Sequence, residues 1–363
     1  MTWRWTDELI APLAERLRDG DWDRVEAARD DGWLALARGS LGNSLAWHRF
    51  SSDGESTLTP VTVLADQRLA AQRALGQWLA AGCSIRLLAH KVGSRATFQL
   101  QPCQQTAPCF YAKVYHRNRS LVERWHALSA SDRFTTPRVI DFDAESQVLS
   151  MSEFPGTSLN ASWRAGSASA VDGQLLAELL HWIASHAPRE ELPQHGAVDE
   201  IRLLEARHSV YVRATARPFP SAQKLLATVA QALDCLPRPR VTLAHRDLHD
   251  KQVIVNGSAI GLIDLDLVAN APRELDAGNL LGHLRLRALK GFLLPWRGIA
   301  SEVTRRLRAL EYGRNELRTW TAATLTRLGF IYSHRHHERE LPEQLFRNAT
   351  DALGGANDWE DIL

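Results

Sequence analysis

The chain has few cysteines, few aromatic residues and no long apolar run. Of its 363 residues, 7% are aromatic and four are cysteine, namely Cys83, Cys103, Cys109 and Cys235. Only one pair is close in sequence and no second pair completes a zinc site, so we expect reduced, structural thiols. No run of 18 apolar residues is present, and the first residues lack the apolar core of a signal peptide. We therefore expect a cytoplasmic protein that does not associate with membranes.

An excess of charge of one sign is also missing. The 43 basic and 42 acidic residues leave a net charge of +1. Nucleic acids and anionic membrane surfaces attract strongly basic proteins, so the charge balance predicts neither partner. With 45% hydrophobic and 23% charged residues the composition is that of a globular protein. The length predicts two or three packing units.

Residues 1–83 predict an extension made of helices and a hairpin. Its expected elements are a helix over residues 7–18, strands over 45–50 and 58–64, and a helix over 66–81. Six of the 12 tryptophans lie in this extension. We expect them to pack it onto the next unit rather than to form a platform for a ligand.

Residues 84–155 predict a small antiparallel sheet with one helix inserted. The expected order is three strands, a helix and two strands, at 84–90, 95–101, 109–116, 118–130, 138–142 and 147–152. Pro155 and Gly156 then mark a domain boundary.

The rest of the chain, residues 156–363, predicts a mainly helical unit. Its expected elements are helices over 171–186, 198–214 and 221–236, and short strands over 242–245, 253–255 and 259–263.

The residues that carry chemistry lie at the ends of the short strands. Asp247 lies in a loop, where it could accept the proton of a hydroxyl group. Alone it would be read as a helix cap or a turn residue, and its spacing from the other residues favours the chemical role. Gln252 and Asp264 supply hard oxygen atoms that suit Mg²⁺. Lys113 is a lone cation on the face of an aromatic strand, where it could hold phosphates. We expect His245 to be a buried residue that holds the loop rather than a base.

These residues resemble the motifs of the aminoglycoside phosphotransferase and choline kinase group within the protein-kinase-like superfamily, over residues 84–290. The catalytic-loop pattern H-x-D-x-x-x-x-N/Q falls on His245, Asp247 and Gln252, and the metal-binding Asp falls on Asp264. The resemblance implies an α+β fold with two lobes, a small antiparallel-sheet N-lobe and a mainly helical C-lobe, here with an N-terminal extension. The closing Asp of the segment after the metal ligand falls on Asp276.

The resemblance also implies how a nucleotide would be held. The strand lysine of the family falls on Lys113 and its helix glutamate on Glu123, which the sequence also allows to be a solvated charge. Gly93 and Ser94 fall in the loop that would cover the phosphates, with one glycine where the family has more. The segment similar to the hinge of the family contributes Met151, Ser152 and Phe154.

The implied activity is transfer of the γ-phosphate of ATP, or of another nucleoside triphosphate, to a hydroxyl group of a small molecule with Mg²⁺. Residues 265–275 contain no Ser, Thr or Tyr, so the segment does not suit regulation by phosphorylation or docking of a polypeptide. The alternative is a kinase-fold protein that binds a nucleotide or a partner without catalysis. A cluster of histidines is expected to form a solvated face rather than a metal site, at His334, His336 and His337.

The charge of residues 283–307 bears on the acceptor. This segment contains six cations and one carboxylate, Glu302. The cations are Arg285, Arg287, Lys290, Arg297, Arg305 and Arg306. Such a surface would repel a polycation. We therefore expect a neutral or anionic acceptor, such as a sugar or a sugar derivative, in preference to an aminoglycoside.

Overall fold

The structure is a computed structural model of the chain. It describes residues 22–27, 33–37, 47–50, 59–61, 63, 66, 69, 71–103, 108–116, 121–215, 219–333 and 340–363. The helix expected over residues 7–18 and the three histidines at 334, 336 and 337 lie outside the described residues.

A four-stranded antiparallel sheet comes first. Its strands, in order, are β1 (Trp22–Ala27), β2 (Trp33–Ala37), β3 (Trp47–Phe50) and β4 (Thr59–Val61). The sequence predicted β3 and β4 but not the other two. Asp23, Arg24 and Glu26 fall within the six residues of β1 and interrupt its hydrophobic pattern, so pairing with β2 makes this segment a strand.

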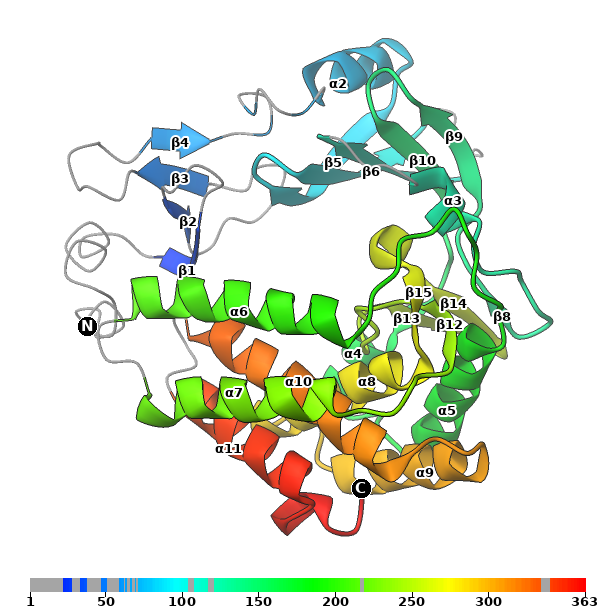
Figure 1. The fold of residues 1–363 in the computed structure, drawn as a ribbon. Helices are drawn as coiled ribbons and strands as arrows, with labels where there is room; N and C mark the ends of the chain where they lie inside the picture. The colour runs from blue at the N-terminus through cyan, green and yellow to red at the C-terminus, as the bar shows by residue number, and fades with distance from the viewer. Residues whose placement is uncertain are drawn as a thin grey trace.

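A five-stranded antiparallel sheet follows, and it confirms the predicted strands. Its strands, in spatial order, are β5 (Ser84–Lys91), β6 (Arg95–Gln101), β7 (Phe110–Tyr115), β10 (Val148–Ser152) and β9 (Val139–Asp143). Helix α2 (Ala71–Ala80) lies against this sheet (Figure 1). Ala71 and Ala74 of the helix share a buried core with Phe98 and Val114 of the sheet. The ring of Trp78 packs edge-on against that of Phe98 at 5.5 Å.

The two faces of this sheet differ because successive residues of a strand alternate. Ala112 and Val114 face the core under α2. Tyr115 joins the core of the helical part instead, and Lys113 lies on the same face as Tyr115. Strand register places Thr97 opposite Lys113 and Arg95 opposite Tyr115. The face predicted to present Lys113 is therefore the one that the helical part covers.

Between β7 and β10 the chain crosses to a second sheet. It forms α3 (Leu121–Trp125) and then β8 (Phe134–Thr135). The expected helix over 118–130 is shorter and ends at Trp125, where the helical hydrogen bonds tighten: the N–H of Ala127 donates to the carbonyl oxygen of Arg124 at 3.2 Å. Strand β8 then pairs in parallel with β14. The second sheet has the order β11 (Thr157–Ser158), β13 (Val253–Asn256), β14 (Ala259–Leu262), β8.

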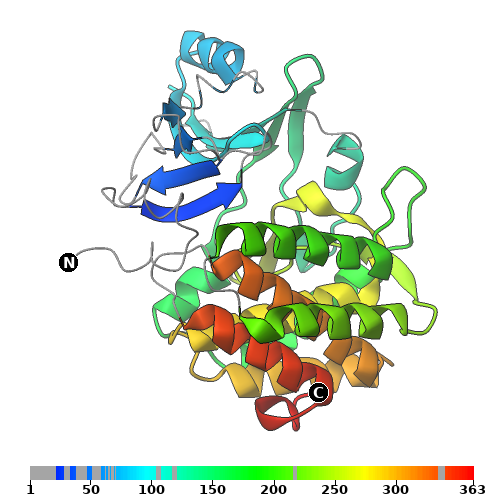
Figure 2. The same ribbon diagram turned by 60° about the vertical axis from the view of Figure 1, so that its left-hand side comes forward.

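The rest of the chain is mainly helical, as expected, and the helices gather on one side of the sheets in both views (Figures 1 and 2). They are α4 (Leu159–Arg164), α5 (Val171–Ala184), α6 (Ala197–Ala214), α7 (Pro220–Asp234), α8 (Arg273–Leu289), α9 (Trp296–Ala309), α10 (Arg314–Tyr332) and α11 (Leu341–Gly354). Two short 3-10 helices, η2 (Leu265–Leu267) and η3 (Asn357–Trp359), and the pair β12 (Val241–Ala244) and β15 (Ala269–Pro272) complete it.

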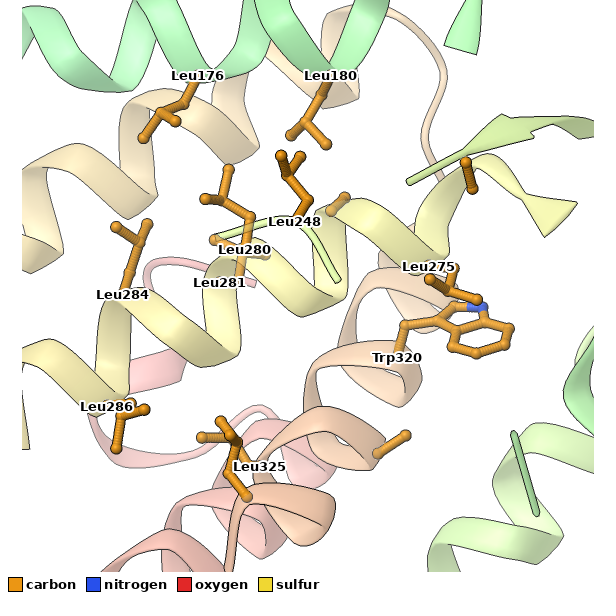
Figure 3. Close-up of a cluster of buried hydrophobic side chains, with 14 of the residues drawn as sticks. Leu176, Leu180, Leu248, Leu275, Leu280, Leu281, Leu284, Leu286, Trp320 and Leu325 are labelled. Atoms are coloured by element: carbon orange, nitrogen blue, oxygen red, sulfur yellow. The ribbon is translucent and has the colours of Figure 1, made fainter. Parts of the chain in front are cut away.

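Leucines of α5 and α8 form the centre of this helical core. Leu176 and Leu180 of α5 point toward Leu280 and Leu284 of α8 (Figure 3). Leu248 lies among them, and none of its surface is exposed. The loop that carries Asp247 is therefore anchored in the core by the next residue.

Helices α8 and α10 approach each other closely at two glycines. A Cβ on Gly278 would lie 2.5 Å from the backbone carbon of Trp320, and one on Gly282 would lie 2.7 Å from Cγ2 of Thr324. Residues four apart share a helix face, so both glycines open the same face of α8 to α10.

The described residues contain no helix that is long and apolar enough to cross a membrane. All four cysteines are free, and Cys103 and Cys235 are exposed rather than buried.

The close approach of α8 and α10 predicts a stability effect. We expect Gly278→Ala to lower the free energy of unfolding by about 1–3 kcal/mol, because the added methyl group has no room. The control is Gly298→Ala in α9, where a Cβ would meet no atom within 4 Å, and it should leave stability unchanged or raise it slightly. Urea unfolding followed by circular dichroism measures both. Equal stabilities for the two variants would show that the helices do not cross in this way.

Candidate active site

The loop between β12 and β13 carries Asp247 and is held from behind by Asp276. The Asp276 carboxylate, in the first turn of α8, accepts from the backbone N–H of His245 at 2.6 Å and of Arg246 at 2.7 Å. Arg246 has a φ of 70°, in the left-handed region, and so turns the chain sharply just before Asp247. The closing Asp of the predicted motif is thus the residue that fixes the start of the catalytic loop.

His245 is a buried residue that holds the loop, as expected from the sequence. Its Nε2 donates to the carbonyl oxygen of Ile263 at 2.9 Å, and its Nδ1 accepts from the backbone N–H of Asp247 at 3.3 Å. Because both ring nitrogens are used and none of the residue is exposed, the histidine connects Asp247 to the strand that ends at Asp264. It does not face a substrate.

Asp250 gives the loop a second buried anchor. Its carboxylate accepts from Nε of Arg287 at 2.8 and 3.0 Å, and from the side-chain amide of Asn160. Asp250 is 1% exposed, so this ion pair is fully enclosed and each charge depends on the other.

Asp247 itself is only partly buried. Within the described part of the chain, no hydrogen bond holds its carboxylate. A carboxylate that is fixed by its backbone on both sides and carries a free acceptor is suited to receive a hydroxyl proton.

Gln252 and Asp264 come together because they flank a tight antiparallel hairpin. Val253 of β13 pairs with Leu262 of β14, so the residue before one strand meets the residues after the other. The backbone N–H of Ile263 donates to the carbonyl oxygen of Gln252 at 3.0 Å, and the Gln252 side-chain amide donates to Asp264 Oδ2 at 3.4 Å. The sequence prediction that these two side chains form one site agrees with their placement.

Lys113 reaches this hairpin from the five-stranded sheet. Its Nζ donates to Asp264 Oδ1 and, at 3.0 Å, to Asp266 Oδ1. The same Nζ lies 5.2 Å from the centre of the Trp125 ring. The predicted phosphate-binding lysine and the predicted metal-binding aspartate are thus in direct contact.

Asp266 is the site residue that the sequence analysis missed. Its Oδ1 also accepts from the Tyr115 hydroxyl at 2.7 Å, and its Oδ2 accepts from Nη1 of Arg95 at 2.7 Å. Asp266 is 2% exposed. It accepts hydrogen bonds from residues of β6 and β7 in the five-stranded sheet. A second carboxylate two residues after Asp264 was the available signal.

The charges around Asp264 set its protonation state. Burial raises the pKa of this carboxyl, but the positive charges of Lys113 and Arg95 outweigh burial and hold the pKa well below its usual range. Burial and the neighbouring Asp266 raise the pKa of the Tyr115 hydroxyl. Asp264 is therefore ionised at neutral pH, as a metal ligand must be, while Tyr115 remains a donor.

Glu123 does not pair with Lys113. It is exposed on α3, and Lys113 bonds the two aspartates instead. The next residue, Arg124, points inward and donates to the backbone carbonyl of Asp266. Of the two roles that the sequence left open for Glu123, the structure places it as a solvated charge, because Leu121 and Trp125 form the buried face of α3.

The turn with Gly93 and Ser94 is short and its amide groups are occupied. The N–H of Gly93 donates to Asp66 Oδ2 at 2.6 Å, and Asp66 also bonds His90 Nε2 at 2.9 Å. The N–H of Ser94 donates to the carbonyl oxygen of Lys91 at 2.9 Å. Gly93 has a φ of 66° and is buried. These amides are thus directed into the fold, which differs from the predicted phosphate cover.

The three predicted hinge residues have different surroundings. Met151 is buried and pairs with Tyr111 in register, on the face that carries Lys113. The N–H of Ser152 donates to the carbonyl oxygen of Arg138 at 2.9 Å, and its Oγ accepts from Arg138 N at 2.9 Å. The Phe154 ring lies over Gly261 of β14, where a Cβ would come within 2.3 Å of it. Of the three, Met151 is the one placed on the same face as Lys113.

The residues present fit a nucleotide with Mg²⁺. Asp264 and Gln252 offer hard oxygen donors, the ligand type that Mg²⁺ prefers, and Asp264 is ionised. Lys113 lies against this pair and offers a cation of the kind that binds phosphates. The arrangement can neutralise polyphosphate charge beside a carboxylate that accepts a proton, which is what phosphoryl transfer requires.

Comparison with known proteins agrees with this chemistry. The sequence model of the APH phosphotransferase enzyme family matches residues 103–345, more than half of the chain. No match is found among the curated proteins.

Solved structures share the fold at low sequence identity. A thermostable mutant of the aminoglycoside phosphotransferase APH(4)-Ia, crystallised with AMP-PNP and hygromycin B, is 16% identical with a TM-score of 0.51, and the match covers 80% of this chain and 97% of that one. For the choline kinase LicA from Streptococcus pneumoniae the values are 11% and 0.53, covering 78% and 99%. A choline/ethanolamine kinase family protein from Mesorhizobium loti is 11% identical, with a TM-score of 0.53, covering 80% and 97%.

The protein-kinase-like fold expected from the sequence is confirmed by these structures, and the match over residues 103–345 shows that the chain belongs to the APH phosphotransferase enzyme family.

Proposed function

We propose that this phosphotransferase moves the γ-phosphoryl group of ATP to a hydroxyl group of a small molecule, with Asp247 as the residue that orients the hydroxyl. The observation that carries the proposal is the contact of Lys113 with Asp264 beside Gln252, next to a loop that leaves the Asp247 carboxylate available. AMP-PNP, an ATP analogue, is bound in the APH(4)-Ia complex of the same fold, which supports ATP as the donor.

Each residue has one task in this reaction. Lys113 binds the nucleotide phosphates, Gln252 and Asp264 hold Mg²⁺, and the ion supplies charge neutralisation when bound. The acceptor oxygen bonds the γ-phosphorus as the bond from that phosphorus to the β–γ bridging oxygen breaks. The hydroxyl proton passes to Asp247, which leaves ADP and a phosphate ester. Met151 would line the nucleotide base from the Lys113 face.

The same contacts argue against a kinase-fold protein that binds without catalysis. A protein that only bound a nucleotide would need Lys113 and a metal ligand. It would have no use for an unbonded Asp247 carboxylate on a loop whose backbone is fixed by His245 and Asp276. The domain limits at residues 83 and 155 stay predictions.

The acceptor is proposed to be a neutral or anionic hydroxyl compound, such as a sugar or a sugar derivative. The cations of residues 283–307 no longer carry this argument, because most are paired. Arg287 bonds Asp250, Arg285 and Arg297 bond Asp358, and both Arg305 and Arg306 bond Glu302.

A different group of cations beside the catalytic loop supports the proposal. Arg124 donates to the carbonyl oxygen of Asp266, and Arg246 donates to that of Leu267 at 3.5 Å, so both guanidinium groups border the same short turn. Arg327 donates to the side-chain oxygen of Asn279, which in turn donates to the carbonyl oxygen of Arg246 at 2.8 Å.

Several carboxylates act on the three arginines: Glu200 and Asp276 on Arg246, Asp266 and Glu123 on Arg124, and Glu200 on Arg327. Burial lowers the pKa of the Arg246 guanidinium, Glu200 counteracts this, and the charges of Arg124 and Arg327 lower the pKa further. Glu200 also bonds Arg327 and His195, at 3.1 Å each, so its charge is shared. Positive charge next to Asp247 would attract an anionic acceptor and repel a polycation.

Replacing the proposed hydroxyl-orienting carboxylate should abolish turnover but not nucleotide binding. We expect Asp247→Asn to lower kcat by about 10²–10⁴-fold, because the amide cannot take the proton, and to change ATP affinity by less than about threefold. ADP release with ATP, Mg²⁺ and a pooled metabolite extract measures the rate. The exposed Asp234→Asn at the end of α7 is the control. Turnover of Asp247→Asn within a few-fold of the unaltered enzyme contradicts the assignment.

Removing the predicted phosphate or metal contact should weaken nucleotide binding. Lys113→Ala and Asp264→Ala should each lower ATP affinity by about 10-fold or more in the presence of Mg²⁺, since each loses a charged contact. Titration calorimetry with and without a chelator measures this, and a thermal melt monitors folding because the pair is buried. Lys224→Ala, exposed on α7, is the control. If neither substitution nor the chelator changes the ATP affinity, the nucleotide site lies elsewhere in the protein.

The acceptor proposal predicts a charge preference. Neutral sugars or anionic hydroxyl compounds should be phosphorylated and kanamycin-type polycations should not, as measured by mass spectrometry of the products. Arg246→Gly keeps the left-handed backbone available and removes one cation, so it should raise KM for an anionic acceptor and leave KM for ATP unchanged. Efficient phosphorylation of kanamycin with sugars and anionic compounds inert would overturn the proposal.

A further inference from the structure

Arg95 is a second cation on the face that carries Lys113. It is the first residue of β6, directly after the Gly93–Ser94 turn, and lies opposite Tyr115 in register. Thr97, two residues on, lies opposite Lys113. Because side chains two apart on a strand share a face, Arg95 and Lys113 project from neighbouring positions toward the same site.

The Arg95 guanidinium reaches both aspartates of the site. Its Nη1 lies 2.7 Å from Asp266 Oδ2, and its Nη2 lies 3.7 Å from Asp264 Oδ2. Asp266 has two further partners, Lys113 at 3.0 Å and Tyr115 at 2.7 Å. Both of these partners bond Oδ1, so Arg95 is the partner of Asp266 Oδ2. A guanidinium has five N–H donors, so Arg95 can keep this bond and still offer other donors to a ligand.

Arg95 is also the accessible cation of the pair. Its side chain is 34% exposed, whereas that of Lys113 is 9% exposed and that of Asp266 is 3% exposed. A metal ion bound to Asp264 would weaken the ion pairs of this carboxylate with Lys113 and Arg95. The more exposed Arg95 then has donors for a nucleotide, because its Nη2 lies 3.7 Å from Asp264 Oδ2 while its Nη1 keeps Asp266.

The neighbouring turn leaves a gap in phosphate binding that Arg95 can fill. In a phosphate-binding loop, backbone N–H groups donate to the phosphate oxygens. Here the N–H of Gly93 is bonded to Asp66 and that of Ser94 to Lys91. A guanidinium at the base of the turn supplies the charged donors that these two amides do not, and its planar geometry suits phosphate oxygens.

The charge of Asp247 also acts on Arg95. Burial lowers the pKa of Arg95, but Asp266, Asp264 and Tyr115 raise it, with a smaller contribution from Asp247, so the guanidinium stays charged. Arg95 thus lies within the field of the metal-site carboxylates and of the hydroxyl-orienting carboxylate, which is where the transferred phosphoryl group must pass.

We propose that Arg95 binds the γ-phosphate of the nucleotide and stabilises the charge on the phosphoryl group during transfer, in place of the turn amides. This inference rests on the proposed function. The bonds made and broken are those given above, and Arg95 neither gains nor loses a proton. A cis arginine of this kind acts on the terminal phosphate and leaves contacts to the α- and β-phosphates to Lys113.

Comparison of two nucleotides tests the role, because ADP lacks the γ-phosphate. Titration calorimetry with Mg²⁺ should show that Arg95→Gln weakens AMP-PNP binding by about 10–100-fold and ADP binding by less than about threefold. Arg95→Lys keeps the charge and loses the planar guanidinium. Its affinity for AMP-PNP should lie between those of the unaltered protein and Arg95→Gln. The matched control is Arg86→Gln on β5, an exposed arginine of the same sheet that lies opposite Gln99.

Three outcomes would count against Arg95. Equal losses for AMP-PNP and ADP, together with a lower melting temperature in both Arg95 variants, would show that the residue only supports the fold. Unchanged binding of both nucleotides to Arg95→Gln would overturn the inference and leave the proposed function intact. Failure of the unaltered protein to bind either nucleotide would overturn the proposed function itself, and this inference with it.

Discussion

The site depends on the ion pairs that join Lys113 to Asp264 and Asp266. Lys113 belongs to the five-stranded sheet, and the two aspartates follow β14 of the second sheet. The contact therefore connects two parts of the fold, together with the bonds from Tyr115 and Arg95 to Asp266. Buried charges are stable only when paired, so the three residues constrain one another, and the Asp264 carboxyl is kept ionised as a consequence.

The helical part of the protein holds its half of the site by several independent means. Asp276 binds two successive amides of the catalytic loop, His245 links the loop to the end of β14, and Leu248 enters the leucine core between α5 and α8. Each means uses a different interaction, namely charge-assisted hydrogen bonds, the hydrogen bonds of an imidazole ring and apolar burial. Asp247 is positioned by all three and remains free to act.

The sheet supplies cations in the place of backbone donors. A hairpin turn fixed by Asp66 gives β5 and β6 a defined register but uses the Gly93 amide. The face that continues from this turn presents Arg95, Tyr115 and Lys113 to the aspartates. Arg124 and Arg246 bond carbonyl oxygens of η2, the turn that carries Asp266. The active residues are thus surrounded by arginines although the net charge of the chain is +1.

The sequence by itself determined the strands of the five-stranded sheet, the face of Lys113, and the meeting of Gln252 with Asp264. These are local results, because strand alternation and a tight hairpin are fixed by neighbours in the chain. It did not determine that β8 pairs with β14, that Glu123 faces solvent, that Asp66 occupies the Gly93 amide, or that Arg95 meets Asp266, 171 residues away. Such contacts join distant segments, and whether two charges meet is decided by how the sheets and helices pack. The tertiary structure alone therefore decided which cations serve the site.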